Sequence, residues 1–206
     1  MNAGPEHEDP DVQLMLKVKS GDRTAFEELV RRHSSLLVNF MFKFVGSLAT
    51  AEDLAQEAFF KVFKAAPTYE PTARFKTWLL TIAANLCMNR KRWEKRRFHH
   101  SLDASGDDDR RPADEVAGSE APPSADMERS ELRVVVRRAV LSLPESQRLA
   151  VILARYHELS YAEIAESMDL TIMAVKSLLN RAKENLRVRL ERELKMSALP
   201  QTGLEL

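Results

Sequence analysis

The chain has 206 residues, of which 44% are hydrophobic and 30% charged, and its formal net charge is zero. This length holds one ordinary domain or two small ones, and the composition excludes a generally disordered chain. Only six glycines and an aromatic content of 7% favour helices over an all-β fold, and the single cysteine, Cys87, excludes an intrachain disulfide.

The first ten residues are polar and acidic, without the apolar core of a signal peptide. No run of about 20 apolar residues is present, so we expect no membrane insertion. The sequence therefore predicts a cytoplasmic protein.

Apolar residues recur at helical spacing through the first block of the chain, residues 11–100. They predict a short helix over 12–19, a long one over 24–45, a third over 51–66 and a fourth from Phe75 to about residue 97. We expect Thr50 to cap the third helix, because Thr is a favoured N-cap residue.

Residues 101–126 differ in composition from the helical blocks around them. They contain three prolines, an acidic run at 107–109 and almost no hydrophobic residues. Such a segment cannot bury enough apolar surface to offset its ordering entropy, so we interpret it as a flexible acidic linker. The tails are expected at 1–10 and 196–206, and a second block at 127–195. The predicted fold is all-α, with two small helical domains.

The second block contains the pattern of a helix-turn-helix. Residues 160–163, Ser-Tyr-Ala-Glu, form a capping-box pattern ahead of a short helix, and a break at 169–171 precedes a long helix over 172–195. The exposed face of this last helix suits DNA, because its side chains can bond phosphates and base edges. These side chains belong to Lys176, Ser177, Asn180 and Arg181. An ordinary solvated helix pair is the alternative.

The fourth helix of the first block ends in a basic segment, residues 90–97, with six basic residues and one acidic residue. Basic residues favour a helix C-terminus, but six exceed that need and indicate a nucleic-acid face. Tyr69, Phe75 and Trp78 lie just upstream. We interpret Trp78 as a core residue and Tyr69 as the better candidate for stacking on an unpaired base.

The helix over 51–66 carries acidic and amide side chains on one side, from Glu52, Asp53, Gln56 and Glu57. DNA would repel this surface, whereas a basic protein surface would attract it. Simple solvation is the alternative for these residues taken alone.

These motifs together resemble the sigma factors of bacterial RNA polymerase. Residues 51–63 (AEDLAQEAFFKVF) and 75–85 (FKTWLLTIAAN) are similar to two helices of sigma region two. Residues 143–145 (LPE), 159–165 (LSYAEIA) and 175–177 (VKS) are similar to region four. Their order, without a large middle domain, resembles the extracytoplasmic-function subfamily.

The resemblance implies a non-enzymatic subunit that directs core RNA polymerase to promoters and promotes strand opening. It implies that an anti-sigma factor controls the protein, and that the roles fall on three sets of residues. Core polymerase would meet Asp53, Gln56 and Glu57; the melted minus-ten element would meet Ala65, Tyr69, Asn85, Asn89, Arg90 and Arg92; and the minus-thirty-five element would meet Lys176, Ser177, Asn180 and Arg181.

The recognition helix departs from the family pattern at four positions. Family members often have Pro, Gly and Thr at Thr171, Met173 and Ala174, and commonly Arg at Leu178. Leu178 cannot donate a hydrogen bond to DNA and can join the apolar flank instead. The upstream sequence that this helix selects therefore does not follow from the family.

Two other functional classes compete with a sigma factor. A stand-alone helix-turn-helix regulator would use the first block for dimerisation or sensing. An enzyme is disfavoured, because the sequence has no nucleophile arrangement, no metal-ligand spacing and no glycine-rich phosphate loop. We expect no catalytic residues, no metal and no cofactor.

Overall fold

The structure is a computed structural model that describes residues 9–102 and 125–197. All regular elements in these ranges are helices, as the composition and spacing predicted. The first block contains α1 (Pro10–Lys19), α2 (Arg23–Val45), α3 (Leu48–Ala65), a short 3-10 helix (Ala66–Thr68) and α4 (Phe75–Leu102). The second contains α5 (Ala125–Leu141), α6 (Glu145–Tyr156), α7 (Tyr161–Met168) and α8 (Ile172–Ser197). Most of the expected linker, 103–124, lies outside the described residues.

The α2–α3 corner depends on a left-handed residue. Gly46 has φ +83°, which suits glycine, and its amide donates to the carbonyl of Phe42. Ser47 then caps α3, accepting from the amide of Thr50 over 3.4 Å. The expectation that Thr50 would be the cap was wrong, because α3 starts at Leu48, three residues before the expected start and directly after the corner.

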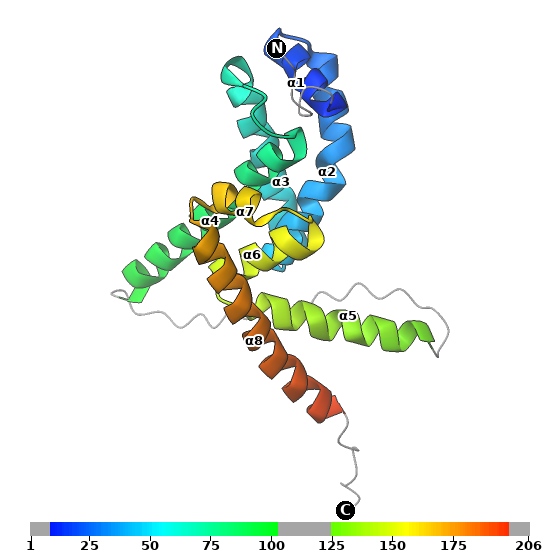
Figure 1. Ribbon diagram of the computed structural model, residues 1–206, viewed down its shortest axis with the longest axis vertical. Helices are drawn as coiled ribbons and strands as arrows, with labels where there is room; N and C mark the ends of the chain where they lie inside the picture. Colours follow the sequence, from blue (N-terminus) through cyan, green and yellow to red (C-terminus); the bar gives the residue numbers. More distant parts are fainter. Residues whose placement is uncertain (1–8, 103–124, 198–206) are drawn as a thin grey trace, which may run out of the picture.

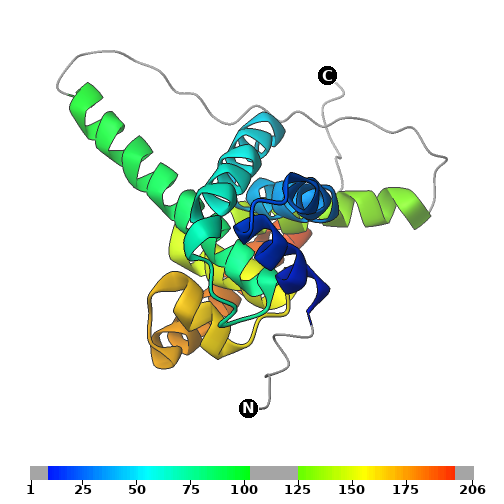
Figure 2. The same cartoon turned by 90° about the horizontal axis from the view of Figure 1, so that it is seen from above.

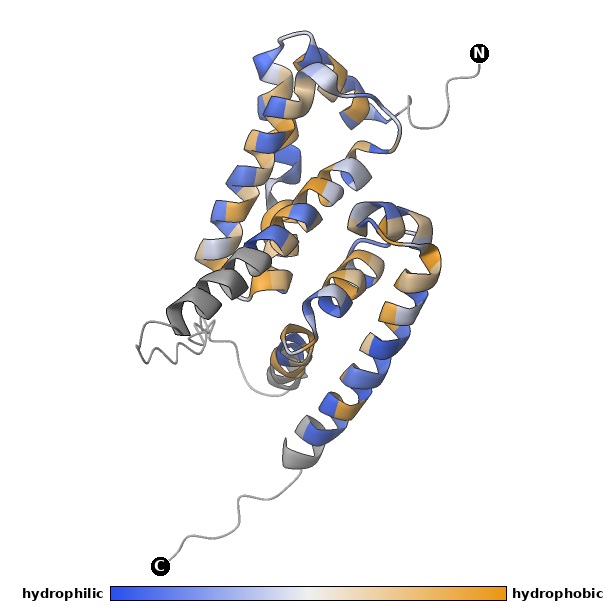
Figure 3. Cartoon of the chain, turned by 90° about the vertical axis from the view of Figure 1, so that its left-hand side faces the viewer, coloured by the Kyte–Doolittle hydropathy of each residue, from blue (hydrophilic) through white to orange (hydrophobic). Residues whose placement is uncertain are grey.

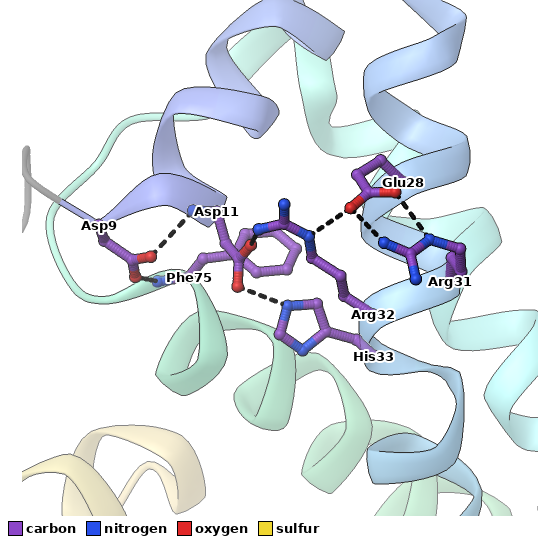
Figure 4. A network of polar contacts seen from close by, with 7 residues as sticks. All are labelled: Asp9, Asp11, Glu28, Arg31, Arg32, His33 and Phe75. Carbon is purple, nitrogen blue, oxygen red and sulfur yellow. Dashed lines mark hydrogen bonds and ion pairs between the residues drawn. The ribbon is translucent and has the colours of Figure 1, made fainter.

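A single carboxylate joins the start of α1 to the start of α4 (Figure 4). Asp9 accepts from the amide of Asp11 at 2.9 Å, which caps α1, and from the amide of Phe75 at 3.1 Å, the first residue of α4. Asp11 in turn contacts His33 on α2, with 2.8 Å between Asp11 Oδ2 and His33 Nε2. These contacts fix the position at which α4 begins.

The two blocks pack against each other. One hydrophobic cluster contains Phe40 and Leu79 from the first block together with Leu149, Ile152 and Ile164 from the second. In Figure 1, α7 lies against α4, and Figure 2 shows α4 and α5 leaving the packed body in different directions. The sequence had suggested two tethered blocks and gave no sign of this contact.

Hydrogen bonds cross the same interface. Thr77 donates to Glu163 over 2.8 Å, and the hydroxyl oxygens of Thr81 and Ser167 lie 2.9 Å apart. Arg148 on α6 donates from Nη1 to the carbonyl of Phe44 at the end of α2, over 2.6 Å. Partly buried polar groups that are paired in this way favour one arrangement of the blocks over others.

Candidate functional site

The acidic residues of α3 form an exposed face. Asp53, Gln56 and Glu57 are all exposed, whereas Leu54 and Ala58, on the other side of the helix, are 3% and 0% exposed. The face combines negative charge with hydrogen-bond acceptors and is presented to solvent. Its chemistry fits a basic protein surface and opposes DNA.

An apolar residue extends this acidic face, and sequence reasoning missed it. Phe60 is 57% exposed and follows Asp53 by seven residues, which places both on the same side of α3. Lys64 Nζ lies 4.5 Å from the centroid of the Phe60 ring. A large exposed aromatic ring is typical of a protein–protein contact. The signal in the sequence was the position of Phe60 outside the core spacing.

Tyr69 does not present its ring to solvent. The residue is 3% exposed, and its ring packs edge-on against Trp78, with the centroids 4.8 Å apart. Burial, with a smaller effect of the Asp9 charge, raises the pKa of Tyr69 to about 12. The structure thus places the Tyr69 ring in the core, and stacking of this ring on an unpaired base stays a prediction. Ala65, the last residue of α3, is half-buried.

Two of the expected minus-ten residues lie along one side of α4. Asn85 and Asn89, four residues apart, are both exposed, and Arg90 is half-buried. The helix continues past Arg92, whose side chain lies outside the described ones. The amides of Asn85 and Asn89 can donate to and accept from base edges or phosphates.

The helix-turn-helix forms as the sequence predicted. Ser160 and Glu163 make both hydrogen bonds of the capping box at the start of α7. Asp169, with φ +53°, ends α7 in the left-handed region, and Thr171 accepts from the amide of Ala174 over 3.2 Å to cap α8. The turn between the helices is thus fixed at both ends.

The face of α8 that was predicted to bind DNA is open to solvent. Lys176, Ser177, Asn180 and Arg181 are all exposed. Val175 and Ala182, on the opposite side, are both 0% exposed, and Leu178 is half-buried at the edge of the apolar side. Figure 3 shows that α8 is mostly hydrophilic beyond its start. This face therefore presents two cationic and two neutral hydrogen-bonding side chains to solvent on one side of α8.

A partly open apolar hollow of about 590 Å³ lies between α2, α5 and α6. Phe42 and Val136 contribute to its apolar lining, and Lys43, Arg133 and Arg137 place basic groups around it.

Among residues 9–102 and 125–197, no group of three His, Cys, Asp or Glu side chains could hold a metal ion. No described helix is long and apolar enough to span a membrane.

Two family models match the chain. Sigma-70 region 2 matches residues 29–97, which contain the α3 and α4 candidates. Sigma-70, region 4 matches residues 133–186, which contain the helix-turn-helix.

Curated relatives match most of the chain. It is 34% identical over 178 residues to the ECF RNA polymerase sigma-E factor of Escherichia coli, covering 84% of this chain and 91% of the relative. It is 32% identical over 177 residues to the RNA polymerase sigma-H factor of Pseudomonas aeruginosa, covering 86% and 92%. It is 28% identical over 184 residues to the ECF RNA polymerase sigma factor SigW of Bacillus subtilis, covering 87% and 98%.

Two solved structures share the fold. CnrH in complex with the cytosolic domain of CnrY aligns with a TM-score of 0.63 and 23% identity, covering 88% of this chain and 97% of that chain. The sigma factor RpoE in complex with the anti-sigma factor NepR from Bartonella quintana aligns with a TM-score of 0.60 and 24% identity, covering 81% and 96%.

Proposed function

This chain belongs to the ECF family of RNA polymerase sigma factors, and we propose that three of its surfaces divide the work of promoter recognition. The observation that carries the proposal is the presence, in one chain, of an acidic face with an exposed phenylalanine and a separate cationic helix-turn-helix face. The first repels DNA and the second attracts it. Sigma factors direct core RNA polymerase to promoters and make or break no covalent bond themselves.

Core polymerase binds the α3 face in this proposal. Asp53, Gln56 and Glu57 meet a basic surface of the enzyme, and Phe60 inserts its ring at the edge of the contact. The exposed carboxylates steer the encounter, and the aromatic ring supplies most of the buried apolar area.

The minus-ten element binds along α4. Asn85 contacts unpaired bases, and Asn89, Arg90 and Arg92 contact DNA at the upstream edge of the element. Because the Tyr69 ring is buried against Trp78, stacking by Tyr69 requires the loop around Ala65–Tyr69 to rearrange. Among the side chains of this set that the structure describes, the amides of Asn85 and Asn89 are exposed and can meet DNA without such a rearrangement.

The minus-thirty-five element binds α8 in the major groove. Arg181 and Asn180 bond base edges, and Lys176 and Ser177 bond a phosphate or a base edge near the start of the helix. Leu178 stays at the apolar flank and makes no polar contact with DNA.

The two blocks separate when both elements are bound. The element names place them roughly 25 base pairs apart, which is about 85 Å of duplex. In the structure α7 is hydrogen-bonded to α4, and α8 begins only a short turn after α7 ends, so the DNA-binding faces of α4 and α8 lie much closer together than this. A closed chain therefore cannot reach both elements, and the α4–α7 contact must open.

An anti-sigma partner opposes this opening. One solved relative in the same fold is a sigma factor bound to an anti-sigma factor, and the family resemblance carries the same expectation here. The hollow between α2 and α5 forms between the two blocks, so a segment seated in it would hold them together. Its basic rim and apolar lining suit an acidic amphipathic segment.

Co-elution with core RNA polymerase tests the proposal against the alternative of a stand-alone regulator. A sigma factor co-elutes with core enzyme and protects promoter DNA only in its presence. A regulator protects a palindromic site without polymerase and elutes apart from core enzyme, and that outcome would reject the proposal.

A further inference from the structure

The recognition helix begins with an apolar side chain in open solvent. Met173, in the first turn of α8, is 72% exposed, more than any other exposed large hydrophobic residue of the described chain. The same helix buries Val175 and Ala182 completely. Ile172 and Val188 of the same helix are also exposed, at 46% and 37%, but Met173 is the most exposed of the three.

Helical geometry places Met173 on the DNA-facing side of α8. At about 100° per residue, Met173 lies roughly 20° from Asn180 and roughly 40° from Ser177 around the helix axis. It lies about 180° from Ala182, which is 0% exposed against the protein body. The methionine side chain thus leaves the helix in the same direction as the polar residues that face solvent.

The start of α8 is held in place, which fixes this direction. Thr171 caps the helix through the amide of Ala174, at 3.2 Å, and the amide of Val175 donates to the carbonyl of Thr171, at 3.0 Å. In a helix-turn-helix, the N-terminal residues of the second helix are those that contact base edges in the major groove. Met173 stands at that end, one turn before Lys176.

The major groove offers one apolar group to such a side chain, the C5-methyl of thymine. The thioether of methionine is flexible and polarisable, and it can adapt to a methyl group without a fixed hydrogen-bond geometry. Resting on the proposed function, we propose that Met173 determines specificity in the upstream element by contacting a thymine methyl group. Lys176 and Arg181 contact phosphate or guanine nearby, so the thymine lies at the end of the element reached by the first turn of α8.

The test measures base preference with the holoenzyme assembled from core RNA polymerase and the full chain. Promoter fragments with a randomised upstream element are selected and sequenced for the wild type, Met173→Ala, Met173→Leu and Arg181→Ala. The preference of Met173→Ala for thymine at one position should be about fourfold to fifteenfold weaker than that of the wild type, which corresponds to one or two buried methyl groups. Met173→Leu should keep it. Alanine favours helix, so the start of α8 should be preserved.

A second measurement removes the methyl group from the DNA instead of the protein. The selected fragment is made with deoxyuridine in place of that thymidine. The wild type should bind the deoxyuridine fragment more weakly than the thymidine fragment, by the same factor, and Met173→Ala should bind both fragments equally. The inference would be overturned if Met173→Ala kept the thymine preference, or if the wild type bound both fragments equally. In either case, a changed base preference in Arg181→Ala would still support the proposed function. Failure of the wild-type holoenzyme to select any upstream element would overturn both.

Discussion

Thr77 on α4 donates a hydrogen bond to Glu163 on α7, with 2.8 Å between Thr77 Oγ1 and Glu163 Oε1. The other oxygen of the same carboxylate accepts from the amide of Ser160, also at 2.8 Å, and closes the capping box of the helix-turn-helix. Burial alone would raise the pKa of Glu163, but the hydrogen bonds from Ser160 and Thr77 and the charge of Arg74 lower it. One ionised side chain thus shapes the DNA-binding motif and joins it to the other block.

A disulfide across this interface should block promoter recognition reversibly. The hydroxyl oxygens of Thr81 and Ser167 lie 2.9 Å apart, so Thr81→Cys with Ser167→Cys places two thiols within bonding reach. The oxidised chain should lose transcription by about 100-fold or more, because the two tethered DNA contacts can no longer act together. Run-off transcription before and after reduction measures the effect.

Each single cysteine variant serves as a control for that lock. Native Cys87 is 0% exposed and does not compete for the new thiols. Equal transcription by the oxidised and reduced double variant would show that the closed arrangement does not limit promoter binding.

Charge reversal on α3 should remove core binding. Asp53→Lys with Glu57→Lys places two cations where a basic surface is expected, and the affinity for core polymerase should fall by about 100-fold or more. Both side chains are exposed, so the thermal unfolding midpoint should stay near that of the wild type. A matched control, Glu27→Lys with Glu70→Lys, reverses two other exposed charges and should bind normally. Equal losses in both pairs would reject the assignment to α3.

Replacing Arg181 and replacing Lys176 should change DNA binding in different ways, one in its sequence preference and the other in its salt dependence. Arg181→Ala should weaken binding to the upstream element by about 1–3 kcal/mol and relax the preference at one base pair. If Lys176 meets a phosphate, Lys176→Ala should weaken binding to all sequences alike and reduce the salt-dependence slope by about 1. Titrations of holoenzyme on matched and mismatched promoters at several salt concentrations separate the two effects. Identical binding curves for Arg181→Ala and the wild type would refute base reading by Arg181.

His157 should make the closed structure sensitive to acid. Its ring lies 5.3 Å from that of Phe40, across the interface, and its Nε2 is buried without a hydrogen-bond partner among the described residues. Burial, helped by the charges of Lys76 and Lys43, lowers the pKa of His157 from 6.5 to about 4. Between these pH values the unfolded state binds a proton at His157 and the folded state does not. The free energy of unfolding therefore decreases as the pH falls from 6.5 towards 4.

This loss should be about 1 kcal/mol between roughly pH 7.5 and pH 5.5. Urea unfolding of the wild type and of His157→Phe at both pH values measures it. The phenylalanine variant keeps an aromatic ring at this position but cannot be protonated there, so its free energy of unfolding should change less over this range than that of the wild type. The same pH dependence in both proteins would exclude His157 as the source.

Local patterns in the sequence predicted the helices well because their causes are local. The capping box of Ser160 and Glu163 and the break at Asp169 lie within a few residues of the structure they determine. The cap of α3 was misplaced by three residues, since both Ser47 and Thr50 are good caps and the corner at Gly46 decided between them.

Contacts between distant segments were not predictable from these patterns. The Tyr69 ring is buried because α4 brings Trp78 against it, and the hydrogen bond of Thr77 with Glu163 joins residues 86 positions apart. Thr77 is buried, although a threonine gives no sign of burial in the sequence. Phe60 was overlooked because an aromatic residue on an amphipathic helix is more often in the core.

The most direct test of the central claim is run-off transcription with purified core RNA polymerase on a pool of genomic promoter fragments, with and without the full chain. A sigma factor predicts transcripts that require the chain, start downstream of a shared pair of elements, and disappear with the Asp53→Lys, Glu57→Lys variant. The absence of chain-dependent transcripts, together with elution of the chain apart from core enzyme, would contradict the account and leave a plain DNA-binding regulator.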